Sequence, residues 1–391
     1  MKKISTAIQS LIASGLGLPG MQELLAQELS DDGINAQLTY YDEAPLPLSK
    51  LAFGSPERYK INTQQLSWVK NLDETYNLTV EYVHEAMSGS SPMYVIPSAD
   101  EGPLQAMTGA TIRDKRDQLS ASLQWDNEAY KHTAALGYSI ENDYQAIFGS
   151  YAGEKESTDG MHTLSWGWSF SEDKIEPYDA IDNGRVLSAK RNSFSASGGF
   201  TQVLNKNAVI QTGVSVTREA GFLSDPYKQV WVNDSVLNDS RPDSRLMWAW
   251  TTKFRQYMTR SKAALHLDYR YFIDDWGIHS NTLDASWNQP LGHDWEIAPS
   301  IRYYTQTSPD FYGPVFFIAP EDAYWSSDYR LATYGSLSYQ LNTSLRKEKW
   351  SLSFGAEYYQ SKEDLALVGT PQDTPALVDF WRLTASFTIK L

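Results

Sequence analysis

The last thirteen residues of the chain, 379–391, alternate between apolar and polar side chains almost without error. The apolar positions are Trp381, Leu383, Ala385, Phe387, Ile389 and Leu391. Successive side chains of a β-strand point to opposite faces of the sheet, so this strand borders an apolar medium on one side and a polar medium on the other. The pattern therefore predicts a strand that separates two media.

The same alternation returns along the rest of the chain in about sixteen segments of about ten to fifteen residues. These segments are 33–43, 58–71, 74–86, 113–127, 129–140, 143–156, 160–174, 189–204, 206–220, 243–258, 261–276, 278–291, 294–309, 327–343, 348–362 and 378–391. A tilted strand of about 9–11 residues crosses a bilayer. Each segment is therefore long enough to span a membrane.

The connections between these segments are sorted by length, because long links mostly alternate with tight turns. The long links are 44–57, 87–112, 175–188, 221–242, 310–326 and 363–377, and two further links, near 141 and 277, are short hairpins. A barrel with both termini in the periplasm has short periplasmic turns and longer extracellular loops. The sequence thus predicts an all-β fold: a single closed antiparallel transmembrane β-barrel of about 16 strands. Ending on an alternating strand with an apolar last residue is typical of Gram-negative outer-membrane barrels.

Composition excludes several other classes of protein. A mean hydropathy of −0.45 and the lack of a long apolar run past the N-terminus exclude a helical membrane protein. The 13 Trp and 24 Tyr fit the aromatic girdles of a barrel, whereas a soluble all-β protein would not need so many Trp. A net charge of −15 argues against a nucleic-acid partner, and the absence of Cys removes disulfides and thiolate chemistry.

The N-terminus predicts export. Lys2 and Lys3 precede a mildly apolar stretch, and a tolerable cleavage site follows at Ala26. We therefore expect residues 1–26 to be a signal peptide and 27–391 to form the barrel.

Alternation also assigns a face to each side chain. In 261–276, for example, Leu267 would face lipid, and in 243–258 Trp250 would face lipid while Lys253 faces the lumen. Five titratable residues from three consecutive segments are expected to face the lumen together: His266, Asp268, Arg270, Asp284 and Arg302. Such a group can set ion selectivity, or it can be a structural cross-strand network of His266 with Asp284 and Arg302.

Several short phrases are more specific than the alternation. They are SGSSP at 88–92, SDPYK at 224–228, RPDSR at 241–245, LDYRY at 267–271 with DWGI at 275–278, WNQPLG at 287–292, and RYYTQ at 302–306 with DFY at 310–312. In this order they resemble an uncharacterised family of Gram-negative outer-membrane proteins that is described only as a domain of unknown function. The resemblance covers nearly the whole mature chain and is strongest from about 222 to 312.

The resemblance implies an outer-membrane location in a Gram-negative bacterium. Family members are often encoded near a small lipoprotein, a flavin transferase and a thioredoxin-like protein, which implies periplasmic redox work. The family offers no catalytic residues to carry over. The expected partners are outer-membrane lipid and lipopolysaccharide, the barrel-assembly machinery, and a small lipoprotein or periplasmic redox protein.

The residues themselves give only weak signals for catalysis or metal binding. Asp225, Asp234, Asp239 and Asp243 lie in one oxygen-rich loop, but their spacing does not match a calcium loop, and a solvated loop is the simpler interpretation. Among the His residues, only His132 is clearly turned outward within a strand, too near a periplasmic turn for a lipid-cleaving Ser–His pair. No catalytic residue and no cofactor is predicted.

Three functions remain open at this point. The first is a pore or transport channel with a polar, charged lumen. The second is a scaffold barrel that docks a lipoprotein or a periplasmic electron-transfer partner. The third and weakest is a lipid-modifying enzyme.

Overall fold

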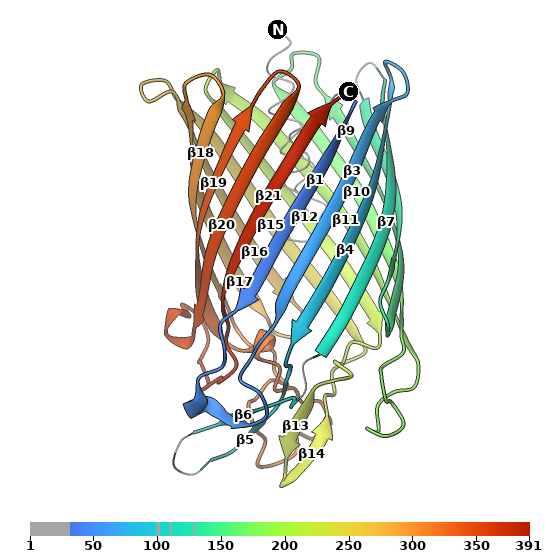
Figure 1. Cartoon of the computed structure of the whole chain (residues 1–391), viewed down its shortest axis with the longest axis vertical. Coiled ribbons are helices and arrows are strands. Elements are labelled where there is room, and N and C mark those ends of the chain that lie inside the picture. The colour runs from blue at the N-terminus through green and yellow to red at the C-terminus, as the bar shows by residue number, and fades with distance from the viewer. Residues whose placement is uncertain (1–31, 99, 101, 110–111, 128–129) are drawn as a thin grey trace.

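A computed structural model describes residues 32–98, 100, 102–109, 112–127 and 130–391 (Figure 1). The predicted signal peptide, 1–26, lies outside these residues. Within the described part of the chain, no helix has the length and apolar character needed to cross a membrane.

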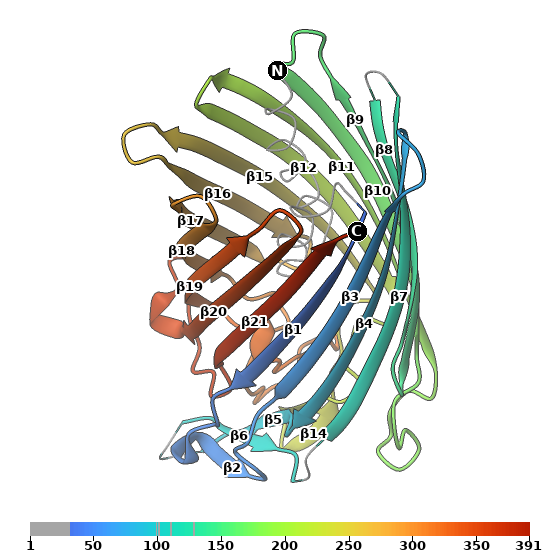
Figure 2. The same ribbon diagram turned by 45° about the horizontal axis from the view of Figure 1, so that its top comes forward.

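Sixteen antiparallel strands form a closed barrel, and their inclined course around the wall is visible in Figure 2. The barrel strands are β1 (Gly33–Glu43), β3 (Lys60–Asn71), β4 (Tyr76–Gly89), β7 (Ile112–Asn127), β8 (Tyr130–Ile140), β9 (Tyr144–Glu156), β10 (His162–Ile175), β11 (Ala189–Asn205), β12 (Ala208–Gly221), β15 (Ser244–Met258), β16 (Ala263–Asp274), β17 (His279–Leu291), β18 (Trp295–Gln306), β19 (Tyr334–Arg346), β20 (Trp350–Lys362) and β21 (Asp379–Lys390). The first and last strands pair with each other, from Gly33 with Lys390 to Glu43 with Phe380. This pairing closes the wall.

The predicted strands are confirmed, most of them to within a few residues. The largest error concerns β19, which begins at Tyr334 rather than near 327, because Tyr329–Leu331 form a 3-10 turn (η3) instead of extended chain. Pro299 lies inside β18 with no register shift, although its lack of an N–H is expected to disturb a ladder. The β17–β18 ladder accordingly has no pair between Ser286–Ser300 and Gln289–Ile297, whereas Pro299 still pairs with Leu341 of β19.

The two ends of the barrel differ. At the turn end, where β1 begins and β21 ends, consecutive strands are joined by tight connections (Figure 1). At the loop end, six of the eight connections are long, and those near 141–143 and 275–278 are short. This is the predicted sorting by length.

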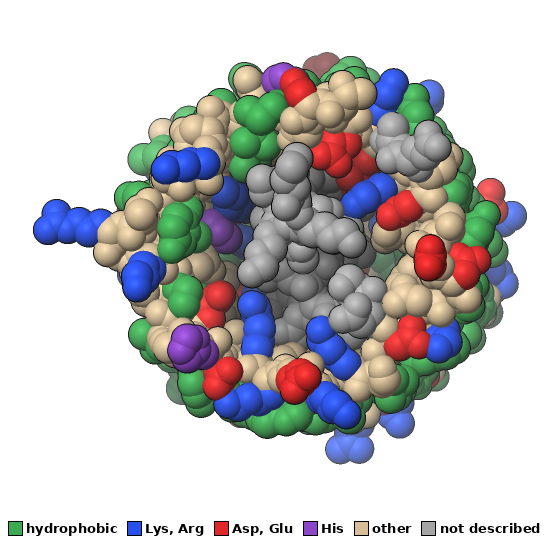
Figure 3. Space-filling view, turned by 90° about the horizontal axis from the view of Figure 1, so that it is seen from above, with side chains coloured by type: hydrophobic (Ala, Val, Ile, Leu, Met, Phe, Trp, Pro, Cys, Tyr) green, Lys and Arg blue, Asp and Glu red, His purple; other side chains and the backbone are tan. Residues whose placement is uncertain are grey.

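The two faces of the wall also differ as predicted. Trp250 and Leu283 are 56% and 51% exposed on the outer surface, whereas the inward-facing Lys253 and Glu357 are each 7% exposed. From the turn end, hydrophobic side chains surround the outside while Lys, Arg, Asp and Glu lie around the rim and the interior (Figure 3). The barrel therefore has an apolar outer surface and a polar lumen.

Five of the six long connections at the loop end fold into a cap, which comprises the described residues of 44–59, 90–109, 222–243, 307–333 and 363–378. The cap contains a three-stranded sheet of β2 (Leu51–Phe53), β6 (Leu104–Met107) and β5 (Pro92–Ile96), a hairpin of β13 (Gln229–Val232) and β14 (Ser235–Asn238), and the 3-10 turns η2 (Leu48–Lys50), η3 and η4 (Glu363–Leu365). The sequence did not predict these elements, because each is only three to five residues long.

The cap connects opposite walls of the barrel. In the strand order, β12 and β15 lie on the far side from β1, β3 and β4. Nevertheless Lys228, between β12 and β15, donates a 2.7 Å hydrogen bond to the carbonyl of Pro92, between β4 and β7. The guanidinium of Arg58 lies 5.1 Å from the ring centroid of Tyr329 and donates to the carbonyl of Ala376. The connections therefore reach across the loop-end mouth.

Candidate functional site: the lumen and its cap

The five predicted lumen residues all face the interior, on the neighbouring strands β16, β17 and β18. Asp268 and Asp284 are direct register partners, which alone would place two like charges side by side. Each carboxylate is compensated by an arginine of a flanking strand. Arg302 of β18 lies 2.5 Å from Asp284, and Arg255 of β15 makes two bonds to Asp268, one of them 2.9 Å long.

The hydrogen-bond partners predicted for His266 are wrong. His266 has Arg255 and Ser286 as register neighbours, and within the described residues no hydrogen bond joins it to Asp284 or Arg302. The pairing of Arg255 with Asp268 was not predicted from the sequence. Alternation gives the face of a residue but not the neighbour that it meets across the ladder.

Arg270 differs from the other arginines of this wall. Six inward-facing arginines have a carboxylate partner on a strand of the barrel: Arg116, Arg191, Arg245, Arg255, Arg302 and Arg382. Among the described residues, Arg270 makes no ion pair, and its guanidinium lies 5.2 Å from the ring centroid of Phe272. The nearest carboxylates along its own face, Asp268 and Asp284, are already occupied by Arg255 and Arg302.

We call the pairs Arg255–Asp268 and Arg302–Asp284 the charged row. An aromatic shelf, consisting of six inward-facing rings, lies between the charged row and the cap. Its members are Tyr41, Phe272, Tyr304, Tyr334, Tyr359 and Phe380. The centroids of Tyr359 and Phe380 are 4.6 Å apart and stacked, those of Phe380 and Tyr41 are 4.7 Å apart, and those of Tyr304 and Tyr334 are 5.9 Å apart. All six side chains are only partly buried. The shelf was not predicted from the sequence.

The opposite part of the wall, β8 to β12, presents small side chains to the lumen. Its inward positions include Ala135, Gly137, Ser150, Ala152, Ser165, Gly167, Ser193, Ser195, Ser197, Gly199, Gly213 and Ser215. Phe148 and Tyr144 are large exceptions in this small-residue wall, and the ring of Phe148 lies directly over Gly137. Small side chains therefore occupy little of the lumen along the middle of this part of the wall.

Within the cap, charged side chains are buried together. Asp328 receives bonds from Arg330 and from Arg241, whose Nη2 is 3.0 Å away, and Arg241 also bonds to Asp239 at 2.7 Å. Burial alone would raise the pKa of Asp328, but Arg330 and Lys228 hold that pKa well below its usual range. Burial lowers the pKa of Lys228. The cap is thus a packed structure with a charged interior.

The acidic loop was expected to be solvated, and this is wrong for Asp239, which is 6% exposed. Of the four weak metal candidates, the structure brings Asp225 and Asp239 together, since the amide of Asp225 donates to the carboxylate of Asp239 at 2.9 Å. Both are engaged by arginines, Asp225 by Arg330 at 2.7 Å. Asp234 lies at the β13–β14 turn and Asp243 directly before β15.

A different group of carboxylates meets at the β8–β9 hairpin. Ligand oxygens of Asp114, Glu141 and Asp143 all lie within 4.8 Å of one another. Burial, reinforced by the nearby Asp114, raises the pKa of Glu141 to about 7. The three side chains are partly exposed, and this closeness alone does not define a metal site.

The outer wall carries one polar group that the sequence analysis missed. His84 faces outward on β4, as register partner of Asp117 on β7, and its Nδ1 is 2.8 Å from the Asp117 carboxylate, which also accepts from Tyr82. His132 is therefore not the only outward-facing His. In the described residues no serine or threonine hydroxyl bonds to His84, so this pair lacks the nucleophile of a lipid-cleaving site.

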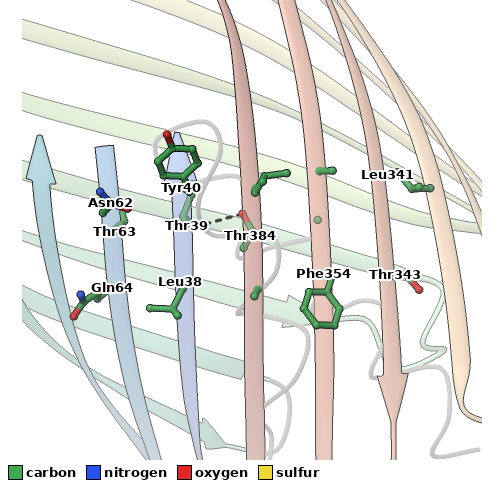
Figure 4. A pocket seen from close by; sticks show the side chains of 14 residues that line it. Leu38, Thr39, Tyr40, Asn62, Thr63, Gln64, Leu341, Thr343, Phe354 and Thr384 are labelled. Carbon is green, nitrogen blue, oxygen red and sulfur yellow. Dashed lines mark hydrogen bonds between the residues drawn. The ribbon is translucent and has the colours of Figure 1, made fainter. Parts of the chain in front are cut away.

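A hollow of about 710 Å³ also lies on the outer wall, over β3, β1, β21, β20 and β19 (Figure 4). Leu38, Leu341, Phe354 and Leu383 form its apolar sides, and these residues are among the exposed hydrophobics of the outer surface. The hollow therefore belongs to the membrane side of the wall and is not part of the lumen.

A closed sixteen-stranded antiparallel wall with an apolar outside and a polar inside defines a β-barrel of the outer-membrane type. The chain belongs to the family of proteins of unknown function DUF3570, whose model matches residues 8–380. This agrees with the family resemblance noted from the sequence phrases.

Solved structures with a similar outline are outer-membrane barrels of low sequence identity. They include a bacterial polysaccharide outer-membrane secretin (9% identity, TM-score 0.47, covering 92% of this chain and 98% of that one). A monoaromatic hydrocarbon channel, CymD, has 10% identity and a TM-score of 0.45 over 98% and 97% of the two chains. OccD3 from Pseudomonas aeruginosa has 8% identity and a TM-score of 0.44 over 92% and 91%. No curated protein matches the sequence.

Proposed function

We propose that the protein is a solute channel in the outer membrane of a Gram-negative bacterium, with its loop end outside the cell and its mouth narrowed by the cap. The observation that carries this proposal is the partial exposure of the charged row of the lumen. The side chains of Asp284 and Arg302 are 22% and 37% exposed, although they form a direct ion pair. Charged side chains that remain partly exposed inside a barrel line a watery passage.

The dimensions of the wall support a passage. Sixteen-stranded barrels are wide enough for an aqueous channel, whereas eight-stranded barrels are filled by their own side chains. Here the small-residue wall adds space on one side of the lumen. Selectivity would come from the charged row and the aromatic shelf on the other side.

The cap is the observation that favours the second candidate, a docking barrel. Its interlocked connections reach across the mouth, so an outside partner would meet a folded surface rather than an open pore. A lipoprotein or a periplasmic redox protein would then bind at one end of the barrel. The two functions differ in whether the isolated barrel conducts ions across a bilayer.

Single-channel recording in planar bilayers tests the proposal. We expect the full chain to show steps of low conductance, and the variant Asp328→Asn, which weakens the cap from inside, to show larger steps. The matched control is Asp117→Asn, a carboxylate of the outer wall, which should leave the steps unchanged. If neither the parent protein nor Asp328→Asn conducts although both are folded, the channel proposal fails and the docking barrel takes its place.

A further inference from the structure

We infer that the aromatic shelf and Arg270 form a binding site for an organic monoanion that carries a flat ring, with aromatic carboxylates as the ligand class. The inference rests on the proposed channel function and specifies the solute.

The charge of Arg270 is unmatched among the described residues. Two ion pairs next to it are each neutral: Arg255 with Asp268, and Arg302 with Asp284. Arg270 adds one positive charge to the charged row, and within the described residues no carboxylate binds it. A guanidinium presents donors in a planar fork that fits a carboxylate with two parallel bonds. We therefore take the missing partner of Arg270 to be an anion from outside the described residues, supplied by a solute.

Aromatic rings of the shelf lie next to the charge of Arg270. Phe272 is two residues further along the same face of β16, with its ring 5.2 Å from the Arg270 guanidinium. Tyr304 shares the register row of Arg270 through Thr282, and it contacts Tyr334 at 5.9 Å. A carboxylate bound by Arg270 would place the remainder of its molecule next to aromatic faces.

The shape of the aromatic shelf suits a flat ring. Aromatic rings prefer offset-stacked or edge-to-face partners, and such contacts add to the free energy of simple burial. A flat ring can therefore lie against the shelf, whereas a small ion such as chloride or acetate would use Arg270 alone. The opposite wall presents mostly small side chains to the lumen at mid-strand. The shelf and the guanidinium of Arg270 therefore select for a ring and for a negative charge together.

The experiment uses the full chain in detergent and isothermal titration with four probes. Benzoate supplies ring and carboxylate, acetate only the carboxylate, benzyl alcohol only the ring, and glucuronate a sugar ring with a carboxylate. We expect benzoate to bind at least about tenfold more tightly than acetate or benzyl alcohol. If acetate binds as tightly as benzoate, the inference is wrong. If glucuronate binds more tightly than benzoate, the ligand class is wrong.

Variants identify the site. Arg270→Gln should weaken benzoate binding about tenfold, because a hydrogen-bonded charge partner is lost, and should leave benzyl alcohol binding unchanged. Arg270→Lys keeps the charge without the planar fork, so its affinity for benzoate should lie between those of the parent protein and Arg270→Gln. Tyr304→Leu should weaken both ring-bearing probes. The controls are Lys155→Gln, a cation of the outer wall, and Phe148→Leu, a large ring of the small-residue wall, which should bind benzoate like the parent protein.

The outcomes separate this inference from the channel proposal. Binding of benzoate through Arg270 in a barrel that never conducts would contradict the channel and support the site. Conduction without any preference for benzoate, or an unchanged affinity in a folded Arg270→Gln barrel, would contradict the site and leave the channel. Folding of each variant is checked by the shift between boiled and unboiled samples on a gel.

Discussion

Arginine–aspartate pairs occur in two regions of this molecule, the lumen and the cap, and they differ in their contact with water. In the lumen, the side chains of Arg302 and Asp284 are 37% and 22% exposed. In the cap, those of Arg241 and Asp328 are 10% and 1% exposed. The chemistry of the two pairs is the same, but the surrounding medium is not.

This difference changes what each pair contributes. An exposed ion pair contributes about 0–1 kcal/mol, because water solvates either partner when the other is lost. Breaking a buried pair costs about 3–5 kcal/mol, because a charge remains buried without compensation. The cap pairs should therefore determine whether the cap folds, and the lumen pairs which ions the passage prefers.

The largest expected effect is that of Asp328→Ala in the cap. It leaves Arg241 buried with only Asp239 and should destabilise the cap by about 3–5 kcal/mol, while the barrel strands persist. Protection of cap amides from hydrogen exchange measures this effect. Asp284→Ala in the lumen is the matched control and should cost about 1 kcal/mol or less. Equal losses of protection in the two variants would remove the distinction between the regions.

The outer wall provides a third medium, without water. Trp250→Arg would place a charge in hydrocarbon at a cost of about 2–4 kcal/mol, whereas Ser286→Arg places it in the lumen. We expect the first variant to fold poorly into lipid bilayers and the second to fold like the parent protein. The fraction of heat-modifiable barrel on a gel is the measurement. Similar yields for both would show that the assigned faces are wrong.

The pH response of the loop end should depend on Glu141. Its folded pKa of about 7 lies above the ordinary value of 4.5, so the β8–β9 hairpin loses stability as the pH rises from about 4.5 to 7. The pH dependence caused by Asp328 has the opposite sign. Its pKa is lowered, so its contribution to the stability of the cap is present at neutral pH and is lost only in strong acid. Protection factors of the hairpin amides, corrected for the base-catalysed rise of intrinsic exchange, should be lower at pH 8 than at pH 5. Glu141→Gln should abolish this difference.

The smallest effect on stability is expected for Asp268→Asn in the lumen. Arg255 loses its carboxylate partner but stays in contact with water, so the cost should be below about 1 kcal/mol. The extra positive charge should shift the reversal potential across a salt gradient toward anion preference. Asp117→Asn on the outer wall is the control and should cause no shift. An unchanged reversal potential in Asp268→Asn would mean that ions do not pass this row.

Much of the barrel could be predicted because alternation is a local property. The face of Asp268, Arg270 or Trp250 follows from its own neighbours in sequence. The partner of Asp268 did not follow, because it depends on the register between β15 and β16. Tyr359 and Phe380 stack directly although 20 residues separate them in sequence, and Tyr41 joins them only through closure of the barrel.

The cap could not be predicted for a related reason. Its contacts join residues that are very distant in sequence, such as Arg241 with Asp328, 87 positions apart, and Lys228 with Pro92, 136 positions apart. The loop residues in between show no periodicity. Their acidic side chains were expected to be solvated, because the sequence does not reveal which arginines pair with them inside the cap.

The pairing of β1 with β21 has a consequence for biosynthesis. Almost the entire chain lies between the two strands of this seam, from Gly33 to Lys390. A nascent chain that has not yet received β21 would hold fifteen strands with two unpaired edges. Backbone groups left without a partner in hydrocarbon cost several kcal/mol each, so such an intermediate cannot rest in a bilayer. Insertion must therefore wait for the last twelve-residue strand, and loss of that strand alone should leave the barrel unable to enter the membrane.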